Sequence, residues 1–413
     1  MRNFPRLFFL LATVLLTGLA AAAQPGSGSQ PKPKPGPKAG PAVPVATVVA
    51  RAEAQYGAYL RQYPDSTQHP RSTNPDGTLA RVAYRDWTSG FFAGSLWNLA
   101  RLSGQARWQR PAAAFTGTLE PQKNTTTTHD LGFVLYNSFG LGYERTRRPD
   151  YRAVLLQAAA SLATRFNPRV GAIRSWDHHA DTWAYPVIVD NLLNLELLFA
   201  ATRLSGDTSY AHIAKTHAAT DLKHRFRPDY STYHVLNFDP ATGRLLTRAT
   251  HQGFADNSCW ARGQAWAIYG YTMLYRETRD PRFLQAAQGA ADYFLAQTAR
   301  IADHIPYWDF NAPDIPNAPR DASAAAAAAS GLLELSQYAP PKNPYHAAAT
   351  AILASLSSPE YLAAAGTNNF FLLKHSTGNK PANTEIDVPM VYADYYFLEA
   401  LWRYQHSPQR PRQ

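Results

Sequence analysis

The chain has a single cysteine among its 413 residues, and this scarcity restricts how the fold can be held together. One thiol cannot form an intramolecular disulfide, so the folded state has to depend on its apolar core. Cys259 stands beside Trp260 at the start of an apolar segment, a position typical of a packed side chain and not of a reactive thiol.

Several short motifs that carry common chemistries are missing as well. The sequence contains no HExxH motif or Cys–His spacing for a metal ion, no GxGxxG or GxxxxGKS/T loop for a phosphate group, and no GxSxG elbow for a serine nucleophile. We therefore expect neither a metal nor a cofactor. Aspartate and glutamate side chains remain as the candidates for acid–base chemistry.

Acidic residues are absent from the first 50 positions, which have a composition of their own. Arg2 and Arg6 precede an apolar run at residues 7–19 and then three alanines, which is the order of a cleaved secretory signal. The run is short for a membrane span, and no cysteine follows it that could carry a lipid anchor. We expect a periplasmic or secreted protein without a membrane span after cleavage. Its predicted parts are a signal peptide (1–23), a disordered linker rich in Pro, Gly and Lys (24–44), one catalytic domain (45–405) and a tail (406–413).

The charge balance gives no indication of a nucleic-acid partner. The formal net charge is +10, but five of the 40 basic side chains precede residue 51, which leaves 35 basic against 30 acidic side chains. A surplus this small does not require nucleic acid. It is compatible with an anionic small substrate or a polysaccharide fragment.

Strand-like alternation is scarce, whereas apolar residues recur at spacings of three and four from about residue 45 to residue 405. Every second helical segment is apolar almost all round, which is typical of a helix buried on all sides, while its partner has one polar face. Six buried helices alternating with six half-exposed ones favour an all-α fold, an (α/α)6 barrel, over a solenoid, because a closed ring needs no capping repeats. The predicted helices are 45–63, 87–103, 106–118, 131–147, 150–166, 188–204, 208–225, 259–279, 281–298, 321–338, 343–357 and 388–405.

Six aspartates stand at the start of apolar helices, where the usual role of Asp is to cap free backbone N–H groups. Asp190 differs from a simple cap because it lies in the apolar stretch YPVIVDNLLNLE, where desolvation would raise the pKa of its carboxyl toward that of a general acid. Asp130 also stands out, since it follows the polar run TTTTH and precedes a packed helix. The six are Asp86, Asp130, Asp190, Asp256, Asp321 and Asp387.

Long loops rich in aromatic residues precede four of the Asp-led helices, at residues 166–187, 226–258, 299–320 and 359–387. They fall on the same side of each repeat, so in a barrel they would gather over one opening, where a ligand should bind. Tryptophans are concentrated in and beside these loops, and their flat apolar rings suit the faces of sugars. The pattern indicates a carbohydrate ligand. These tryptophans are Trp87, Trp176, Trp183, Trp260, Trp266 and Trp308.

Six motifs in colinear order resemble those of glycoside hydrolase family 88, the unsaturated glucuronyl hydrolases. They are DWTSGFFAGSLW (86–97), THDLGFVLYNSFG (128–140), YPVIVDNLLNLELLF (185–199), ATHQGFADNSCWARGQAWAIYG (249–270), PYWDFNAPDIPNAPRDASAAA (306–326) and EIDVPMVYADYYFLEAL (385–401). The resemblance covers about residues 45–405 and implies a single (α/α)6 barrel.

The resemblance also implies an unusual reaction. Polysaccharide lyases leave a C4=C5 double bond in the terminal uronate, and this family hydrates that bond; the hemiketal then opens and releases the shortened sugar. By its place in YPVIVDN, Asp190 would be the general acid and base. Asp130 would hold the sugar ring and, as a nearby negative charge, help to keep Asp190 protonated.

Further residues that would bind the unsaturated oligosaccharide follow from the same resemblance. Trp87 would stack on the unsaturated ring, while Trp176 and Trp266 would line the cleft. His234, Gln252 and Arg262 would bind hydroxyl and carboxylate oxygens, Arg262 as a bidentate partner of a carboxylate. His129 and Tyr395 would be additional contacts, and Lys380 would be the candidate to meet a sulfate on the leaving sugar.

Three other interpretations stay open at this point. An unsaturated rhamnogalacturonyl hydrolase would share the barrel and the chemistry, although DWTSGFFAG and VIVDNLLNLE favour the glucuronyl group. An ordinary inverting glycosidase would use Asp130 and Asp190 as acid and base. A noncatalytic sugar-binding barrel of an export system is disfavoured by the presence of Asp130, Asp190, His234 and Arg262 together.

Overall fold

The computed structural model describes residues 42–407. The predicted signal peptide and most of the predicted linker, residues 1–41, lie outside the described residues, as do the last six residues of the tail. Residues 42–407 form twelve α-helices, one π-helix, three short 3-10 helices (Ala106–Trp108, Glu120–Asn124 and Asn368–Phe370) and seven short strands. None of the helices in this part of the chain is long and apolar enough to cross a membrane.

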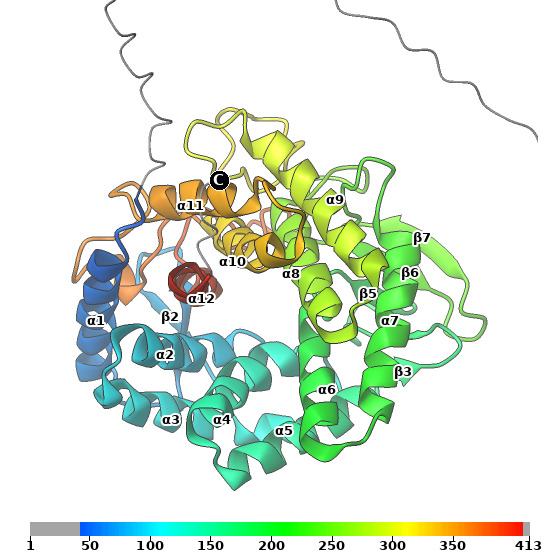
Figure 1. Ribbon diagram of the computed structural model, residues 1–413, viewed down its shortest axis with the longest axis horizontal. Helices are drawn as coiled ribbons and strands as arrows, with labels where there is room; N and C mark the ends of the chain where they lie inside the picture. Colours follow the sequence, from blue (N-terminus) through cyan, green and yellow to red (C-terminus); the bar gives the residue numbers. More distant parts are fainter. Residues whose placement is uncertain (1–41, 408–413) are drawn as a thin grey trace, which may run out of the picture. The chain divides into compact units, whose positions relative to one another are not determined.

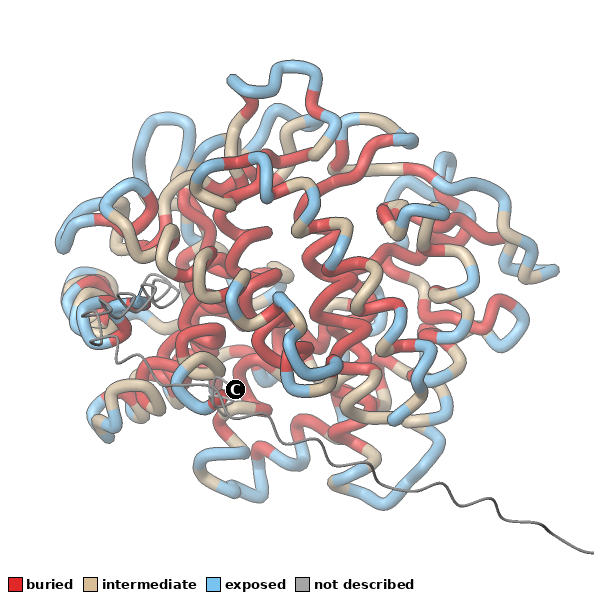
Figure 2. Tube along the Cα trace, turned by 45° about the horizontal axis from the view of Figure 1, so that its top comes forward, coloured by how far each residue is buried: buried red, intermediate tan, exposed pale blue. Residues whose placement is uncertain are grey.

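The helices alternate between an inner and an outer ring (Figure 1). Each inner helix packs against the next, and α12 packs against α2, which closes the ring. The inner helices are buried almost all round (Figure 2). The fold is therefore the expected (α/α)6 barrel. The inner ring consists of α2 (Ser89–Ser103), the π-helix (Gly132–Gly140) with α4 (Leu141–Thr146), α6 (Asn191–Ser205), α8 (Ala261–Thr278), α10 (Ala322–Tyr338) and α12 (Val391–His406). The outer ring consists of α1 (Val45–Gln62), α3 (Gln109–Gly117), α5 (Pro149–Ala163), α7 (Ser209–Arg225), α9 (Pro281–Thr298) and α11 (Tyr345–Leu356).

Glycine permits the close approach of neighbouring inner helices. A Cβ atom on Gly90 of α2 would lie 2.3 Å from the carbonyl oxygen of Val134, and one on Gly132 would lie 2.5 Å from the Cα of Asn194. Atoms do not pack at such distances, so a larger residue at either position would push two inner helices apart.

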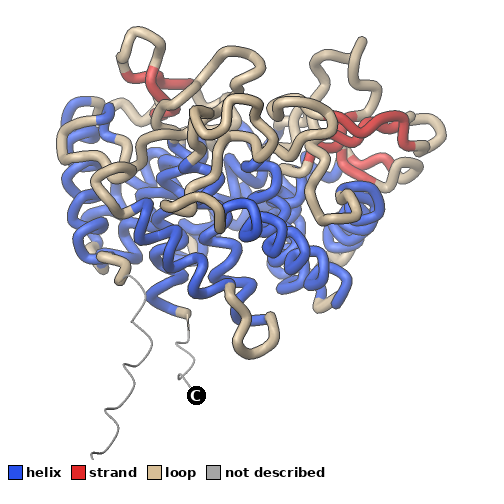
Figure 3. The backbone as a smooth tube through the Cα atoms, turned by 90° about the horizontal axis from the view of Figure 1, so that it is seen from above, coloured by secondary structure: helices blue, strands red, loops and turns tan. Residues whose placement is uncertain are grey.

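The long connections gather at one end of the helices, where they form three small antiparallel sheets (Figure 3). The hairpin β1 (His69–Thr73) and β2 (Leu79–Val82) is the first, and β3 (Phe166–Asn167) with β4 (Ala172–Ile173) is the second. The third has the order β5 (Pro186–Ile188), β6 (Val235–Phe238), β7 (Leu245–Ala249). Ile188 pairs with Val235 in this sheet, which brings the segments of Asp190 and His234 together.

The sequence pattern does not predict β5 and β6, because all seven of their residues are buried and the alternation of polar and apolar residues is missing. The same apolar run places the start of the predicted helix 188–204 too early, since α6 begins at Asn191. The predicted helix 131–147 is a π-helix followed by α4, a distinction that a spacing of three and four does not make.

Candidate active site

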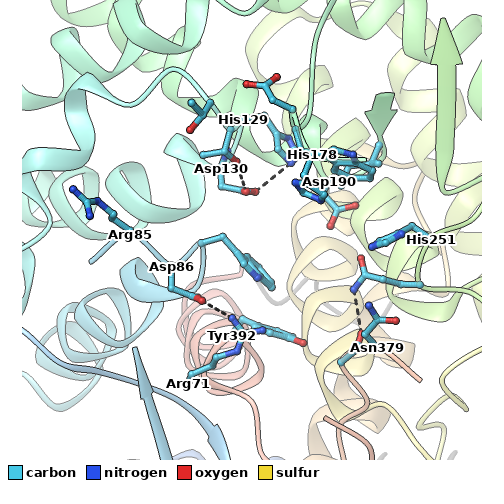
Figure 4. Close-up of a pocket in the computed structure, with 18 of the residues that line it drawn as sticks. Arg71, Arg85, Asp86, His129, Asp130, His178, Asp190, His251, Asn379 and Tyr392 are labelled. Atoms are coloured by element: carbon cyan, nitrogen blue, oxygen red, sulfur yellow. Dashed lines mark hydrogen bonds and ion pairs between the residues drawn. The ribbon is translucent and has the colours of Figure 1, made fainter. Parts of the chain in front are cut away.

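A cavity of about 750 Å³ lies at the end of the barrel where the long loops gather (Figure 4). Its walls come from the starts of inner helices and from the loops that precede them. Of the three sequence-predicted site residues that do not line the cavity, His234 lies directly behind Asp190, whereas Trp266 and Tyr395 lie deeper in the barrel. The seven that line it are Trp87, His129, Asp130, Trp176, Asp190, Gln252 and Arg262.

Asp190 occupies the N-cap position of α6, yet its side chain accepts no hydrogen bond from the helix. Asp321 of α10 shows the contrast, because its carboxylate accepts the N–H groups of Ser323 and Ala324. The Asp190 side chain is buried, and its Oδ2 has no hydrogen-bond partner among the described residues. Burial raises the pKa of Asp190 to about 7; the charge of Arg262 lowers it, and that of Asp130 raises it further. A carboxyl that caps nothing is available for chemistry at neutral pH.

Asp130 immediately precedes the turn that begins the π-helix, and both of its carboxylate oxygens have partners. The Thr128 hydroxyl donates to Oδ2 at 2.6 Å, and Nε2 of His129 lies 3.2 Å from Oδ1. Burial raises the pKa of Asp130 to about 6, and the hydrogen bond from Thr128 opposes this rise. Burial lowers the pKa of His129 well below its ordinary value, so its imidazole is neutral. Of the two carboxyls, Asp130 ionises at the lower pH.

His234 is held in one tautomer by the backbone of the loop after β7. The N–H groups of His251 and Gln252 donate to its Nδ1 at 3.1 and 3.2 Å, so the ring proton resides on Nε2. Nε2 lies 3.8 Å from Oδ2 of Asp190. Burial keeps the pKa of His234 well below its ordinary value. The residue is therefore a neutral N–H donor aimed at the carboxyl of Asp190.

Arg262 has a different environment from the one expected. Its Nη1 donates to Oδ2 of Asp321 and to the carbonyl of Thr377, both at 2.6 Å, and its Nη2 donates to the carbonyl of Gly378 at 2.6 Å. Gln252 donates to the same Gly378 carbonyl at 3.1 Å. These bonds use both N–H groups of Nη1 and hold residues 377–378 at the pocket. A bidentate contact of Arg262 with a substrate carboxylate would therefore use Nη2 and Nε, and this contact stays a prediction.

Two expectations are corrected by burial. The Trp266 ring is fully buried among core aromatics, 5.8 Å from Phe133 and 5.1 Å from Tyr396 between centroids. Tyr395 is also buried, and its hydroxyl donates to Asn137 at 3.1 Å. Both side chains belong to the packing of inner helices below the pocket. Trp176 does stand at the pocket, where it stacks on His178 with ring centroids 5.3 Å apart.

Arg71 and Arg85 line the pocket without having been singled out from the sequence. Arg71 on β1 bridges Asp86 and Glu385 at 2.6 Å each and so joins the segment of Trp87 to the loop before α12. Arg85 is exposed and forms no ion pair within the described residues; its guanidinium lies over the Tyr84 ring. The sequence does not single out either residue, because an isolated arginine is ordinary until its neighbours in space are known. Figure 4 shows Arg71 and Asp86 across the pocket from Asp130 and Asp190.

No family model matches the chain. Direct comparison finds relatives, and the unsaturated glucuronyl hydrolase of Formosa agariphila is 49% identical over 353 residues, which cover 84% of this chain and 87% of that protein. This chain belongs to the unsaturated glucuronyl hydrolases of glycoside hydrolase family 88. The unsaturated chondroitin disaccharide hydrolase of Streptococcus pyogenes is 33% identical over 344 residues, 81% of this chain and 85% of that protein. A solved structure of an unsaturated glucuronyl hydrolase specific for heparin matches with a TM-score of 0.85 at 47% identity, and covers 87% of this chain and 96% of the other.

Membership of this family makes the protein a glycoside hydrolase that acts on oligosaccharides with an unsaturated glucuronyl end. The resemblance drawn from the six motifs is thereby confirmed. These relatives also favour the glucuronyl group over the rhamnogalacturonyl alternative, and an enzyme over a noncatalytic sugar-binding barrel.

Proposed function

We propose that the enzyme acts by hydrating the C4=C5 double bond of the terminal uronate, with Asp190 as acid and then as base. Protonated Asp190 donates its proton to C4, and the positive charge that develops at C5 is shared with the ring oxygen. A water molecule adds at C5 and gives a proton to the Asp190 carboxylate, which restores the starting state. The hemiketal at C5 opens, and the remaining sugar is released.

The observation that carries this proposal is the buried carboxyl of Asp190, which has no partner for Oδ2 among the described residues. With a pKa of about 7 it is partly protonated at neutral pH, so one group can both give and take the proton. The charge of Arg262 limits the rise that burial causes. Arg262 thus acts on the reaction through its field, which stabilises the Asp190 carboxylate that forms when the proton passes to C4.

Asp130 and His234 have supporting roles in this scheme. Both oxygens of Asp130 already accept or approach neighbouring groups, which suits a carboxylate that holds sugar hydroxyls and does not suit a base that must take a proton from water. This argues against the inverting glycosidase, in which Asp130 or Asp190 would activate a water at the anomeric carbon. The Nε2–H of His234 is free to donate to the Asp190 carboxylate or to a substrate oxygen beside it.

We propose an anionic, glycosaminoglycan-derived oligosaccharide as the substrate, in line with the heparin and chondroitin activities of the two relatives. Arg85 supports this, because it is a pocket guanidinium without an ion pair in the described part of the chain. A carboxylate or sulfate would be its natural partner. Lys380, the sequence-based candidate for a sulfate contact, does not line the pocket and has its Nζ 3.7 Å from the Asp314 carboxylate.

We also propose that the enzyme works in the periplasm or outside the cell. The support is the order of basic, apolar and small residues in positions 1–23, which lie outside the described residues. Fusion of residues 1–23 to a reporter that is active only after export tests this proposal.

The test of the reaction follows the near-ultraviolet absorbance of the conjugated alkene. The wild type should remove this absorbance from lyase-generated disaccharides, and Asp190→Asn should lower the rate by on the order of 10³-fold or more with an unchanged circular dichroism spectrum. A saturated disaccharide of the same composition should not be cleaved. Turnover of that saturated sugar would reject hydration in favour of the ordinary glycosidase.

A further inference from the structure

Asn194 connects the two segments that carry the catalytic carboxyls. It lies on α6 one turn after Asp190 and is almost completely buried. Its Nδ2 donates to the backbone carbonyl of Asp190 at 3.3 Å, and its Oδ1 accepts the N–H of Phe133 at 2.8 Å. Phe133 is three residues after Asp130, in the first turn of the π-helix. One amide therefore contacts both helix starts.

The contact with Phe133 replaces a bond that the helix itself cannot make. N–H groups in the first turn of a helix have no partner within the helix, and a buried one needs an external acceptor. Oδ1 of Asn194 is that acceptor for Phe133. The adjacent Gly132 allows the approach, because a Cβ there would lie 2.5 Å from the Cα and 2.8 Å from the Oδ1 of Asn194.

We propose that Asn194 is a positioning residue that fixes α6 against the π-helix and so sets the separation between the carboxyl groups of Asp190 and Asp130. The inference rests on the proposed roles of these two aspartates. It adds a function for a side chain that does not touch the pocket. A shift of about 1 Å between reacting groups is enough to lower the rate of an enzyme by on the order of 10²-fold.

Substitution of Asn194 by leucine removes both hydrogen bonds at similar size. We expect kcat to fall by on the order of 10- to 100-fold, with a change in KM of less than about threefold, since the binding side chains stay in place. The fall of kcat at high pH should also move to lower pH. The Asp130 charge raises the pKa of Asp190, and this effect weakens as the two groups separate.

The matched control is Asn98→Leu. Asn98 is an equally buried asparagine on the inner helix α2, and its amide has no hydrogen-bond partner among the described residues. This variant should keep the wild-type kcat and pH profile, whatever it does to the melting temperature. Asn194→Ser, which is smaller and neutral, serves if the leucine does not fold, and the same downward shift is expected. A crystal structure of either Asn194 variant gives the separation of the carboxyls directly.

The outcomes separate this inference from the proposed function. If the high-pH fall of the wild type is unchanged in the folded Asn194 variants, or if Asn98→Leu shifts it equally, Asn194 is only a packing residue. If Asp190→Asn retains the wild-type rate and profile, the proposed role of Asp190 fails, whatever the Asn194 variants show.

Discussion

Nε2 of His234 lies 3.8 Å from Oδ2 of Asp190, and neither atom has a hydrogen-bond partner in the described part of the chain. The other imidazole nitrogen accepts two backbone N–H groups, which fixes the proton on Nε2. An N–H donor at this place stabilises the carboxylate more than the carboxylic acid. The pair is thus arranged to lower the energy of the ionised state that follows proton transfer to C4.

The two nitrogens of His234 can be tested separately. In His234→Asn the amide oxygen can replace Nδ1 as the acceptor for the loop, but the donor toward Asp190 is lost, so we expect a fall in kcat on the order of 10- to 100-fold with a nearly unchanged melting temperature. In His234→Gln the longer amide can restore the donor, and part of the rate should return. Equal rates in the two variants would show that the Nε2–H has no role in the reaction.

The pH dependence of kcat should be a narrow bell. The rate falls as the pH rises through about 7, because Asp190 loses the proton it must donate, and falls below about 6, because Asp130 becomes protonated. In Asp130→Asn the acid-side fall should disappear, and the basic-side fall should move to lower pH as a neighbouring negative charge is removed. Initial rates from pH 4.5 to 8.5 at constant ionic strength measure both limbs; a flat profile would contradict the assignment.

Ionisation of the Asp190 carboxyl should make the free energy of unfolding depend on pH. Folding raises the pKa of Asp190 from 3.8 to about 7, so ionisation destabilises the folded state. Its contribution to the free energy of unfolding therefore decreases as the pH rises from about 4 to about 7. We expect Asp190→Asn to gain in melting temperature relative to the wild type between pH 4 and pH 8. A difference that stays constant over this range would show that the carboxyl is not desolvated in solution.

Arg85 should determine preference for anionic substrates. For Arg85→Gln we expect kcat/KM to fall about tenfold on a sulfated unsaturated disaccharide and less on the unsulfated one, because a charge-assisted bond to the substrate is lost. The wild-type preference should also weaken with added salt. Arg81→Gln is the control: this arginine lies on β2 over the Tyr63 ring and does not line the pocket. An equal loss of kcat/KM on both substrates would show that Arg85 does not recognise the sulfate.

The helices of the barrel could be predicted because caps and apolar spacing involve residues that are close together in the sequence. The predicted helix 281–298 matches α9 at both ends, where Asp280 caps the helix and Pro281 begins it. The raised pKa of Asp190 follows from apolar neighbours that are adjacent in the sequence. The contacts of Arg262 with residues 321, 377 and 378 and those of Arg71 with residues 86 and 385 are long-range, and a single sequence carries no trace of them.

Trp266 illustrates why the site residues were harder to predict than the helices. It lies one turn after Arg262 on α8, so helical spacing puts both on neighbouring positions of the same face. Only the depth along the barrel separates a side chain that lines the cavity from one that packs beneath it, and periodicity contains no information about depth. Asn194 could not be singled out either, because the sequence does not show what a polar side chain in an apolar helix contacts. Its partner, the N–H of Phe133, is known only once the π-helix is placed beside α6.

The closing contact between α12 and α2 makes the site depend on the helix that completes the ring. Tyr392 of this helix and Glu385 in the loop before it line the cavity. A chain cut before α12 would leave the apolar surfaces of α2 and α10 that pack against this helix in water. A molecule without α12 would therefore carry an exposed apolar surface by which proteases and chaperones can recognise it.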